Sequence, residues 1–394
     1  MINNRPFISD LNIMLRKFTL NPYDNLDLAY EIQMKILERI ILIEKEIISN
    51  KETLKNNKII THDKSTPQEK RKKLGIKNNN LKKINIMLKE NMKEIRSYGD
   101  SIAFTYFNKY YLKPLCWKNS AGFINGKEGL KKELEVFDSY FKKGEFAILN
   151  DITNSLKYGD ITVNNDGKPH LIEIKSSAFV DARVHRQREG LHEKLKIINN
   201  DSIDNLDENG LHFKRVHSKE NEVDYINLLQ NLINEALLSG EAIKEVEQGL
   251  LYVIEYNINQ KNESTKVKNI KQAVSTLKKP HEIVLNLFNG VEDNFTPFPL
   301  LIKNHVALEE FNYGNLLIIT YIDIEIVGNK LKSMGYNLKS FNHDGLIIEF
   351  DMKGKKIDMN VGFHHTSRLG REFISLEWFI KSIDDTIKNV QETL

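Results

Sequence analysis

Two acidic residues and a lysine flank a predicted β-hairpin in the middle of this 394-residue chain. The turn is Asp166-Gly167, a pair that favours a tight hairpin because glycine adopts positive φ at no steric cost. Asp160 lies six positions before the turn's aspartate, and Glu173 lies six positions after its glycine, so pairing brings the two carboxylates opposite each other. Side chains alternate along a strand, so Lys175 points to the same side as Glu173.

These residue types are suited to chemistry on a phosphodiester. Carboxylates on neighbouring strands supply hard oxygen ligands, which suit Mg²⁺ or Mn²⁺ better than Zn²⁺. A cation held by Asp160 and Glu173, with the backbone carbonyl of Ile174 as a further ligand, would polarise the ester and lower the pKa of a bound water. Lys175 would orient that water or offset charge on the phosphate. The pattern therefore predicts a site for metal-dependent phosphodiester hydrolysis.

Asp160, the turn and Glu173-Ile174-Lys175 resemble the motif of the PD-(D/E)XK nuclease superfamily, which has the restriction-endonuclease-like fold. The resemblance covers about residues 127 to 256, where the predicted order is helix, three strands, helix, strand. It implies a mixed sheet, a metal-dependent nuclease and DNA rather than RNA as the substrate, with restriction or antiphage defence as the role. Gly159 stands where that family often has a proline.

Two helices that flank the motif contribute further candidates. Many members of the superfamily add an acid from the helix before the first strand. Glu133, in the predicted helix 127–142, lies about 40° from Phe137 on the apolar face, at 100° per residue. It is therefore the acid that would face the sheet; the alternative is a boundary position whose carboxylate reaches solvent. Gln187, on the apolar stripe of the predicted helix 180–198, looks like the glutamine that several branches carry near the active site.

Polar residues after the lysine strand would contact nucleic acid. Ser176 and Ser177 follow the strand directly, and Arg183 and Arg186 lie beside Gln187. All four could reach the phosphate backbone. The alternatives are the start of a loop for the serines and a solvated helix edge for the arginines.

Basic residues concentrate between Lys45 and Lys93. This stretch holds 14 Lys/Arg against 5 Asp/Glu, whereas the formal net charge of the whole chain is only +3. Helical periodicity over 26–49 and again from Leu81, with a polar loop predicted at 50–67, favours an antiparallel hairpin with a basic tip. The hairpin could be a solvated surface, an arm that contacts nucleic acid, or a surface through which copies of the chain oligomerise.

Composition narrows the class of protein. Apolar residues make up 40% and charged residues 28% of the chain, which is typical of a globular protein. No apolar run is long enough to cross a bilayer, and the N-terminus does not resemble a signal peptide. The single cysteine, Cys116, permits no internal disulfide and excludes a cysteine-rich Zn²⁺ site, so a cytoplasmic location is expected.

Taken together, the patterns predict an α/β or α+β protein in three parts. Residues 1–125 form a helical region with the basic hairpin, and 126–260 form a restriction-endonuclease-like core with an insertion at about 199–249. Residues 261–394 form an α/β extension that completes or flanks the core. The alternatives to a DNA endonuclease are a ribonuclease and a non-catalytic scaffold, with a degenerate nuclease fold, that binds nucleic acid or oligomerises.

Overall fold

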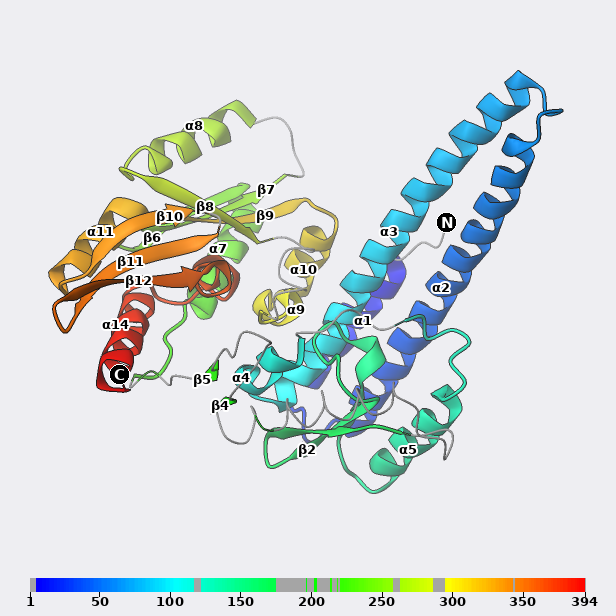
Figure 1. Ribbon diagram of the computed structural model, residues 1–394, viewed down its shortest axis with the longest axis horizontal. Helices are drawn as coiled ribbons and strands as arrows, with labels where there is room; N and C mark the ends of the chain where they lie inside the picture. Colours follow the sequence, from blue (N-terminus) through cyan, green and yellow to red (C-terminus); the bar gives the residue numbers. More distant parts are fainter. Residues whose placement is uncertain are drawn as a thin grey trace. The chain divides into compact units, whose positions relative to one another are not determined.

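The computed structural model describes residues 5–116, 122–174, 196, 202–203, 213–214, 218, 220–257, 263–285, 295–342 and 344–393. The chain divides into two compact units, Met1–Asn200 and Asp201–Leu394 (Figure 1). The fold is mixed α+β, as predicted. Among the described residues, no helix is both long enough and apolar enough to cross a bilayer.

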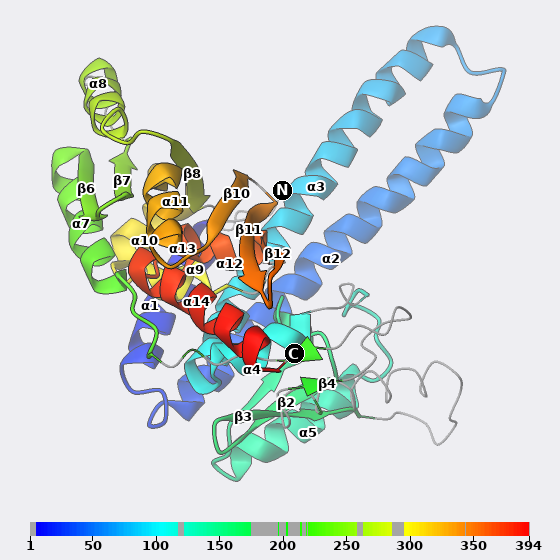
Figure 2. The same ribbon diagram turned by 60° about the vertical axis from the view of Figure 1, so that its left-hand side comes forward.

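A long antiparallel helical hairpin forms much of the first unit, as predicted. Helices α2 (Leu26–His62) and α3 (Gln68–Tyr106) pair along their length, and α1 (Arg5–Leu20) packs against both. Both views show the hairpin projecting from the base of this unit, where α5 and β2 lie (Figures 1 and 2). The prediction of a loop at 50–67 is wrong, because α2 continues to His62 and only 63–67 connect the helices.

Asparagine pairs between the two helices explain why the sequence periodicity stopped short. Asn50 Nδ2 donates to Asn85 Oδ1 at 2.9 Å, and Asn57 Nδ2 donates to Asn78 Oδ1 at 2.8 Å. Leu54 lies between the two asparagines of α2, at the spacing of four and three that marks the inner face of a coiled coil. Buried asparagines fix the register of such a pair at some cost in stability. Polar residues therefore occupy inner positions where a search for apolar residues finds no helix.

A three-stranded antiparallel sheet, in the order β1-β2-β3, completes the first unit. Strand β1 is tied to α2 by Gln33, whose amide donates to the carbonyl of Ala147 and accepts from the amide of Leu149, both at 3.0 Å. Phe137 of α5 is fully buried and stacks on Tyr30 of α2, with ring centroids 5.4 Å apart. The sheet, α5 and the helical hairpin thus share one apolar core. The remaining elements of this unit are β1 (Ala147–Leu149), β2 (Ile161–Asn165), β3 (Lys168–Ile172), α4 (Lys109–Leu112), α5 (Leu130–Lys142), η1 (Lys113–Cys116) and η2 (Asn150–Ile152).

The second unit has a four-stranded antiparallel sheet in the order β6-β7-β9-β8. Helices α7 and α14 contribute to the core on one face of this sheet, and α8 with Leu277 packs on the other. A second antiparallel sheet has the order β10-β11-β12. The strands are β4 (Ser202–Ile203), β5 (Phe213–Lys214), β6 (Glu241–Glu247), β7 (Leu250–Tyr256), β8 (Pro280–Leu285), β9 (Leu316–Asp323), β10 (Asn337–Asn342), β11 (Gly345–Met352) and β12 (Lys355–Gly362). The helices are α7 (Ile226–Ser239), α8 (Glu263–Val274), α9 (Phe298–Leu301), α10 (His305–Asn312), α11 (Ile324–Ser333), α12 (Phe363–Thr366), α13 (Arg368–Arg371) and α14 (Leu376–Thr393).

The partners of β7 differ from the predicted arrangement. The resemblance grouped this strand with the strands of residues 147–172, but β7 pairs with β6 and β9 of the second unit. Its side chains are buried on both faces because α8 covers one side of the sheet and the main core covers the other. A mixed sheet is also not found in the described parts of the chain, where every strand pair is antiparallel. A restriction-endonuclease-like core over 126–260 is therefore not confirmed.

Candidate functional site

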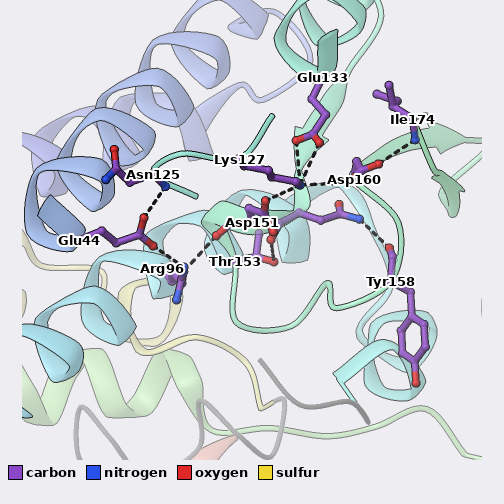
Figure 3. Close-up of polar contacts among 11 residues, drawn as sticks. Glu44, Arg96, Asn125, Lys127, Glu133, Asp151, Thr153, Tyr158, Asp160 and Ile174 are labelled. Carbon is purple, nitrogen blue, oxygen red and sulfur yellow. Dashed lines mark hydrogen bonds and ion pairs between the residues drawn. The ribbon is translucent and has the colours of Figure 1, made fainter. Parts of the chain in front are cut away.

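The ammonium group of Lys127 lies among three carboxylates in the first unit (Figure 3). Its Nζ is 2.9 Å from Glu133 Oε1, 2.9 Å from Asp151 Oδ2 and 3.1 Å from Asp160 Oδ1. The three acids come from three elements: α5, η2 and the residue before β2. Their side chains are only 4%, 19% and 12% exposed, so this is a largely buried group of formal charge −2. We call these four residues the Lys127 cluster.

Glu133 reaches the cluster because α5 buries it. It lies one turn before Phe137 on the inner face of α5, and these two are the buried residues of that helix. This is the face that the helical wheel predicted for Glu133. Burial also raises the pKa of the Glu133 carboxyl to about 7, and the hydrogen bond from Lys127 only partly offsets the effect. For Lys127 itself burial lowers the pKa, but attraction to Asp151 and hydrogen bonds to the acids outweigh it, so the pKa is raised.

Asp160 is fixed by the predicted hairpin. The register pairs Ile161 with Ile172, as counting from the turn predicted, and Asp160 and Glu173 are the residues just beyond this last pair. The backbone amide of Asp160 donates to the carbonyl of Ile172 at 2.8 Å, and the amide of Ile174 donates to Asp160 Oδ2 at 2.7 Å. One carboxylate oxygen is therefore held by backbone, and the other faces Lys127.

The backbone conformation of Gly159 explains why a proline, which the resembled family often has at this position, is absent. Its φ is +75°, whereas proline is locked near −65°. A Cβ at this position would also lie 2.9 Å from the carbonyl oxygen of Ile172. Glycine thus lets the chain turn into β2 while Asp160 bonds to the neighbouring strand.

Asp151 and Lys127 are the members of the cluster that the sequence analysis missed. Asp151 follows the buried strand β1 in η2, and Arg96 of α3 donates from Nε to its backbone carbonyl at 3.0 Å. Helix α3 passes so close to η2 that a Cβ on Gly99 would lie 2.3 Å from the carbonyl oxygen of Ile152. An acid two residues after a short buried apolar run is the signal that could have identified Asp151. No spacing in the sequence marks Lys127.

A second buried acid, Asp100, holds the loop that follows η2. Its Oδ1 accepts from the amide of Asn154 at 2.9 Å and from the amide and hydroxyl of Ser155 at 2.9 and 2.6 Å. Its Oδ2 accepts from Asn154 Nδ2 at 2.8 Å. These four bonds tie the loop to α3. Because the loop directly follows η2, Asp100 also helps to hold Asp151 in place.

The segment before Lys127 is anchored in the same way (Figure 3). Glu44 of α2 accepts from the backbone amide of Asn125 at 2.7 Å, and its other oxygen lies 4.0 Å from Arg96. Burial raises the pKa of Glu44 and lowers the pKa of Arg96, because each charged form loses water. Helices α2 and α3 therefore position both Lys127 and Asp151.

The raised pKa of Glu133 predicts a pH dependence of stability in metal-free protein. Between pH 4.5, the ordinary value, and about 7, the folded protein keeps the Glu133 proton that the unfolded chain has lost. The free energy of unfolding must therefore fall as pH rises through this window, by up to about 3 kcal/mol at 1.36 kcal/mol per pKa unit. Urea unfolding at a series of pH values should show a shallower fall in Glu133→Gln, which cannot titrate. The same pH dependence in both proteins would contradict the assignment.

The other predicted site residues divide into two groups. Glu173 and Ile174 are described: Glu173 is partly buried beyond the end of β3, and the amide of Ile174 bonds Asp160. The roles of Glu173 and of the Ile174 carbonyl as metal ligands stay predictions. Six predicted residues lie outside the described parts of the chain: Lys175, Ser176, Ser177, Arg183, Arg186 and Gln187.

The site must be interpreted from its own chemistry. No family model, curated protein or solved structure matches this chain. Across the residues that the structure describes, Asp, Glu, His and Cys side chains nowhere form a ready three-ligand metal site. What the fold and the site define is an α+β protein whose first unit holds a partly buried ammonium among three carboxylates beside a β-hairpin.

Proposed function

We propose that the first unit is a metal-dependent nuclease centre that hydrolyses phosphodiester bonds. The supporting observation is the Lys127 cluster, in which three largely buried carboxylates share one ammonium. Burying this excess of negative charge is costly unless further positive charge is available. When all three acids are ionised, above the raised pKa of Glu133, a divalent cation would supply the two missing charges. The amino-acid pattern of Asp160, Glu173 and Lys175 independently predicts the same chemistry at the same hairpin.

The chemical type of the donors suits Mg²⁺ or Mn²⁺, although the acids now surround Lys127 rather than a ready metal position. Asp160, Glu133 and Asp151 offer carboxylate oxygens, the ligands that these hard cations prefer, and Glu173 would add a fourth carboxylate. When bound, the cation would polarise the phosphodiester and lower the pKa of a water molecule. In the structure, the Lys127 ammonium lies between the acids and offsets part of their negative charge. Its side chain is 30% exposed and has a flexible stem, so its charge can shift toward solvent or a phosphate.

The residues of the chain itself would provide orientation and charge. The amide of Ile174 holds one carboxylate oxygen of Asp160, Arg96 holds the backbone of Asp151, and Lys127 bonds the Asp151 carboxylate. Such fixed carboxylates present their oxygens without reorganising during the reaction. Lys127 would offset charge on the scissile phosphate once the acids have another cation. Lys175 would orient the attacking water, as the sequence motif predicts.

DNA is the proposed substrate, and restriction or antiphage defence is the proposed role. These two statements rest on the family resemblance alone, as does the choice of an endonuclease. The proposed cytoplasmic location rests on the single cysteine. Oligomerisation through the N-terminal helices is likewise a proposal. The two alternatives, a ribonuclease and a non-catalytic scaffold, are separated by the substrate panel described next.

The full chain should be incubated with plasmid DNA, linear DNA and labelled RNA in Mg²⁺ or Mn²⁺, with EDTA as the metal-free control. We expect DNA cleavage that needs the cation and that falls about 10²-fold or more in Lys175→Met, because the charge on the transition state is then less well stabilised. Lys168→Met is the matched control, since Lys168 lies at the turn end of the same hairpin. Cleavage of RNA alone would indicate a ribonuclease. Cleavage that persists in EDTA, or none on any polynucleotide, would contradict the proposal.

A further inference from the structure

The outer part of the helical hairpin carries a concentration of charge that the proposed nuclease centre does not use. Residues 51–83 contain 11 Lys/Arg and 3 Asp/Glu, a balance of +8. Within this fully described stretch, the single ion pair is Lys73 with Glu69, 2.7 Å apart. Arg71 is occupied by the loop, because it donates to the backbone carbonyls of Asp63 and Lys64. The lysines of this stretch are all exposed, so the segment presents positive charge to solvent.

The coiled-coil geometry sorts the lysines onto sides of the hairpin. The inner positions of α2 are fixed by Asn50 and Asn57, which pair with α3. Lys51, Lys55 and Lys58 follow at spacings of four and three, so they form one stripe beside that seam. On α3 the inner positions are fixed by Asn78 and Asn85, the partners of the two asparagines of α2. In two antiparallel helices, the positions on the same side of the seam lie next to each other. Three lysines of α3 therefore lie on the same side of the hairpin as this stripe. We call the resulting set the lysine face: Lys51, Lys55, Lys58, Lys72, Lys82 and Lys89.

Acidic residues are absent from this side over the described stretch. Glu52 and Glu69 lie at the outermost positions of the two helices, away from the seam, and Asp63 belongs to the connecting loop. Asn79 lies within the lysine face on α3 and adds an amide that can bond to phosphate or sugar. The face therefore offers a row of cations with hydrogen-bonding capacity and no repulsive carboxylate.

We infer that the lysine face binds the phosphate backbone of duplex nucleic acid. The charge is complementary to that of a duplex, which carries a negative charge about every 1.7 Å along its axis. From Lys51 to Lys58 the helix rises about 10 Å at 1.5 Å per residue, which is about three base pairs at 3.4 Å each. Six lysines spread over both helices can thus contact several successive phosphates. The inference goes beyond the proposed hydrolysis, since binding at this face needs no divalent cation and no cleavage.

A membrane is a poorer partner for this surface. A helix that lies on a bilayer buries a continuous apolar face among the lipids. In this hairpin the inner positions face the partner helix, and the exposed Ile59 and Ile76 lie at the outermost positions rather than on the lysine face. Ile86 lies on the lysine face and is 57% exposed, but one isoleucine among lysines does not make a continuous apolar face. Positive charge therefore dominates the lysine face, and charge is the determinant of backbone contacts to nucleic acid.

The test is binding of the full chain to a short fluorescent DNA duplex in EDTA, followed by anisotropy from about 50 to 200 mM salt. We expect the logarithm of the binding constant to fall with the logarithm of salt at a slope of about −5, the value for six phosphate contacts. The variant K51Q/K55Q/K58Q should bind at least tenfold more weakly. Its slope should be shallower by about 3, because three phosphate contacts are lost. The control K70Q/K73Q/K77Q removes the same charge from the other side of the seam and should change binding less than threefold.

Circular dichroism should show that both triple variants keep the helical content of the wild type, because the asparagine pairs are untouched. Undiminished duplex binding by K51Q/K55Q/K58Q, or an equal loss in both variants, would overturn the inference. Binding to vesicles of anionic lipid in preference to the duplex would also overturn it and identify a membrane surface. Because EDTA prevents metal-dependent cleavage, a failed nuclease assay leaves these results unaffected.

Discussion

Asp160→Asn should abolish metal-dependent cleavage, lowering kcat by about 10³-fold or more, because it removes one of the charges that would hold the cation. The substitution keeps the shape of the side chain. Its amide oxygen can still accept from the backbone amide of Ile174, so the hairpin should keep its register. Initial rates at saturating Mg²⁺ measure the loss, and a Mn²⁺ titration of the same protein should show weaker binding.

Asp166→Asn is the matched control for this experiment. It makes the same chemical change at the turn of the same hairpin, where the residue has a φ of +50°. Asparagine and aspartate are the non-glycine residues that most readily adopt positive φ, so the turn should be preserved. We expect wild-type cleavage from Asp166→Asn. Equal loss in the two variants would mean that the charge at Asp160 is not the cause, and full activity in Asp160→Asn would remove that residue from the proposed centre.

Asp100→Ala should destabilise the first unit by about 3–5 kcal/mol, since it leaves buried donors without their acceptor. The carboxylate accepts four hydrogen bonds from Asn154 and Ser155, and its residue is only 5% exposed. Urea unfolding followed by far-UV circular dichroism reports on this unit, because α2 and α3 supply much of its helix.

The isosteric Asp100→Asn gives a graded comparison. Its oxygen can keep the three bonds that Oδ1 accepts, while its amide replaces the oxygen that faces Asn154 Nδ2. We therefore expect a smaller loss, about 1–2 kcal/mol. Equal effects of the two substitutions, or a loss under about 1 kcal/mol in Asp100→Ala, would show that the four bonds do not hold the loop.

Local rules predicted the parts of the candidate site that depend on near neighbours in the sequence. The Asp-Gly turn was sufficient to predict the register of the hairpin, in which Ile161 pairs with Ile172. The helical wheel was sufficient to place Glu133 on the buried face of α5. Both arguments use residues within about a dozen positions, where backbone geometry fixes which side chains can meet.

The helical hairpin shows where local rules stop. Apolar periodicity located both helices but ended α2 too early, because Asn50 and Asn57 occupy inner positions. An asparagine is acceptable there only when a partner asparagine satisfies its amide, and that partner lies on another helix. The last strand of the predicted core, now β7, had the same difficulty: its apolar sequence indicated a buried strand but did not identify β6 and β9 as its neighbours.

The sequence by itself therefore determined the hairpin that carries Asp160, the buried side of α5 and the long basic helices. Only the tertiary structure placed Asp151 and Lys127 beside Asp160 and Glu133. These residues meet because α3 packs directly on η2 at Gly99 and because α2 anchors the segment before Lys127 through Glu44. Contacts of this kind join residues far apart in the chain, and they depend on how whole elements pack rather than on the spacing of neighbouring residues.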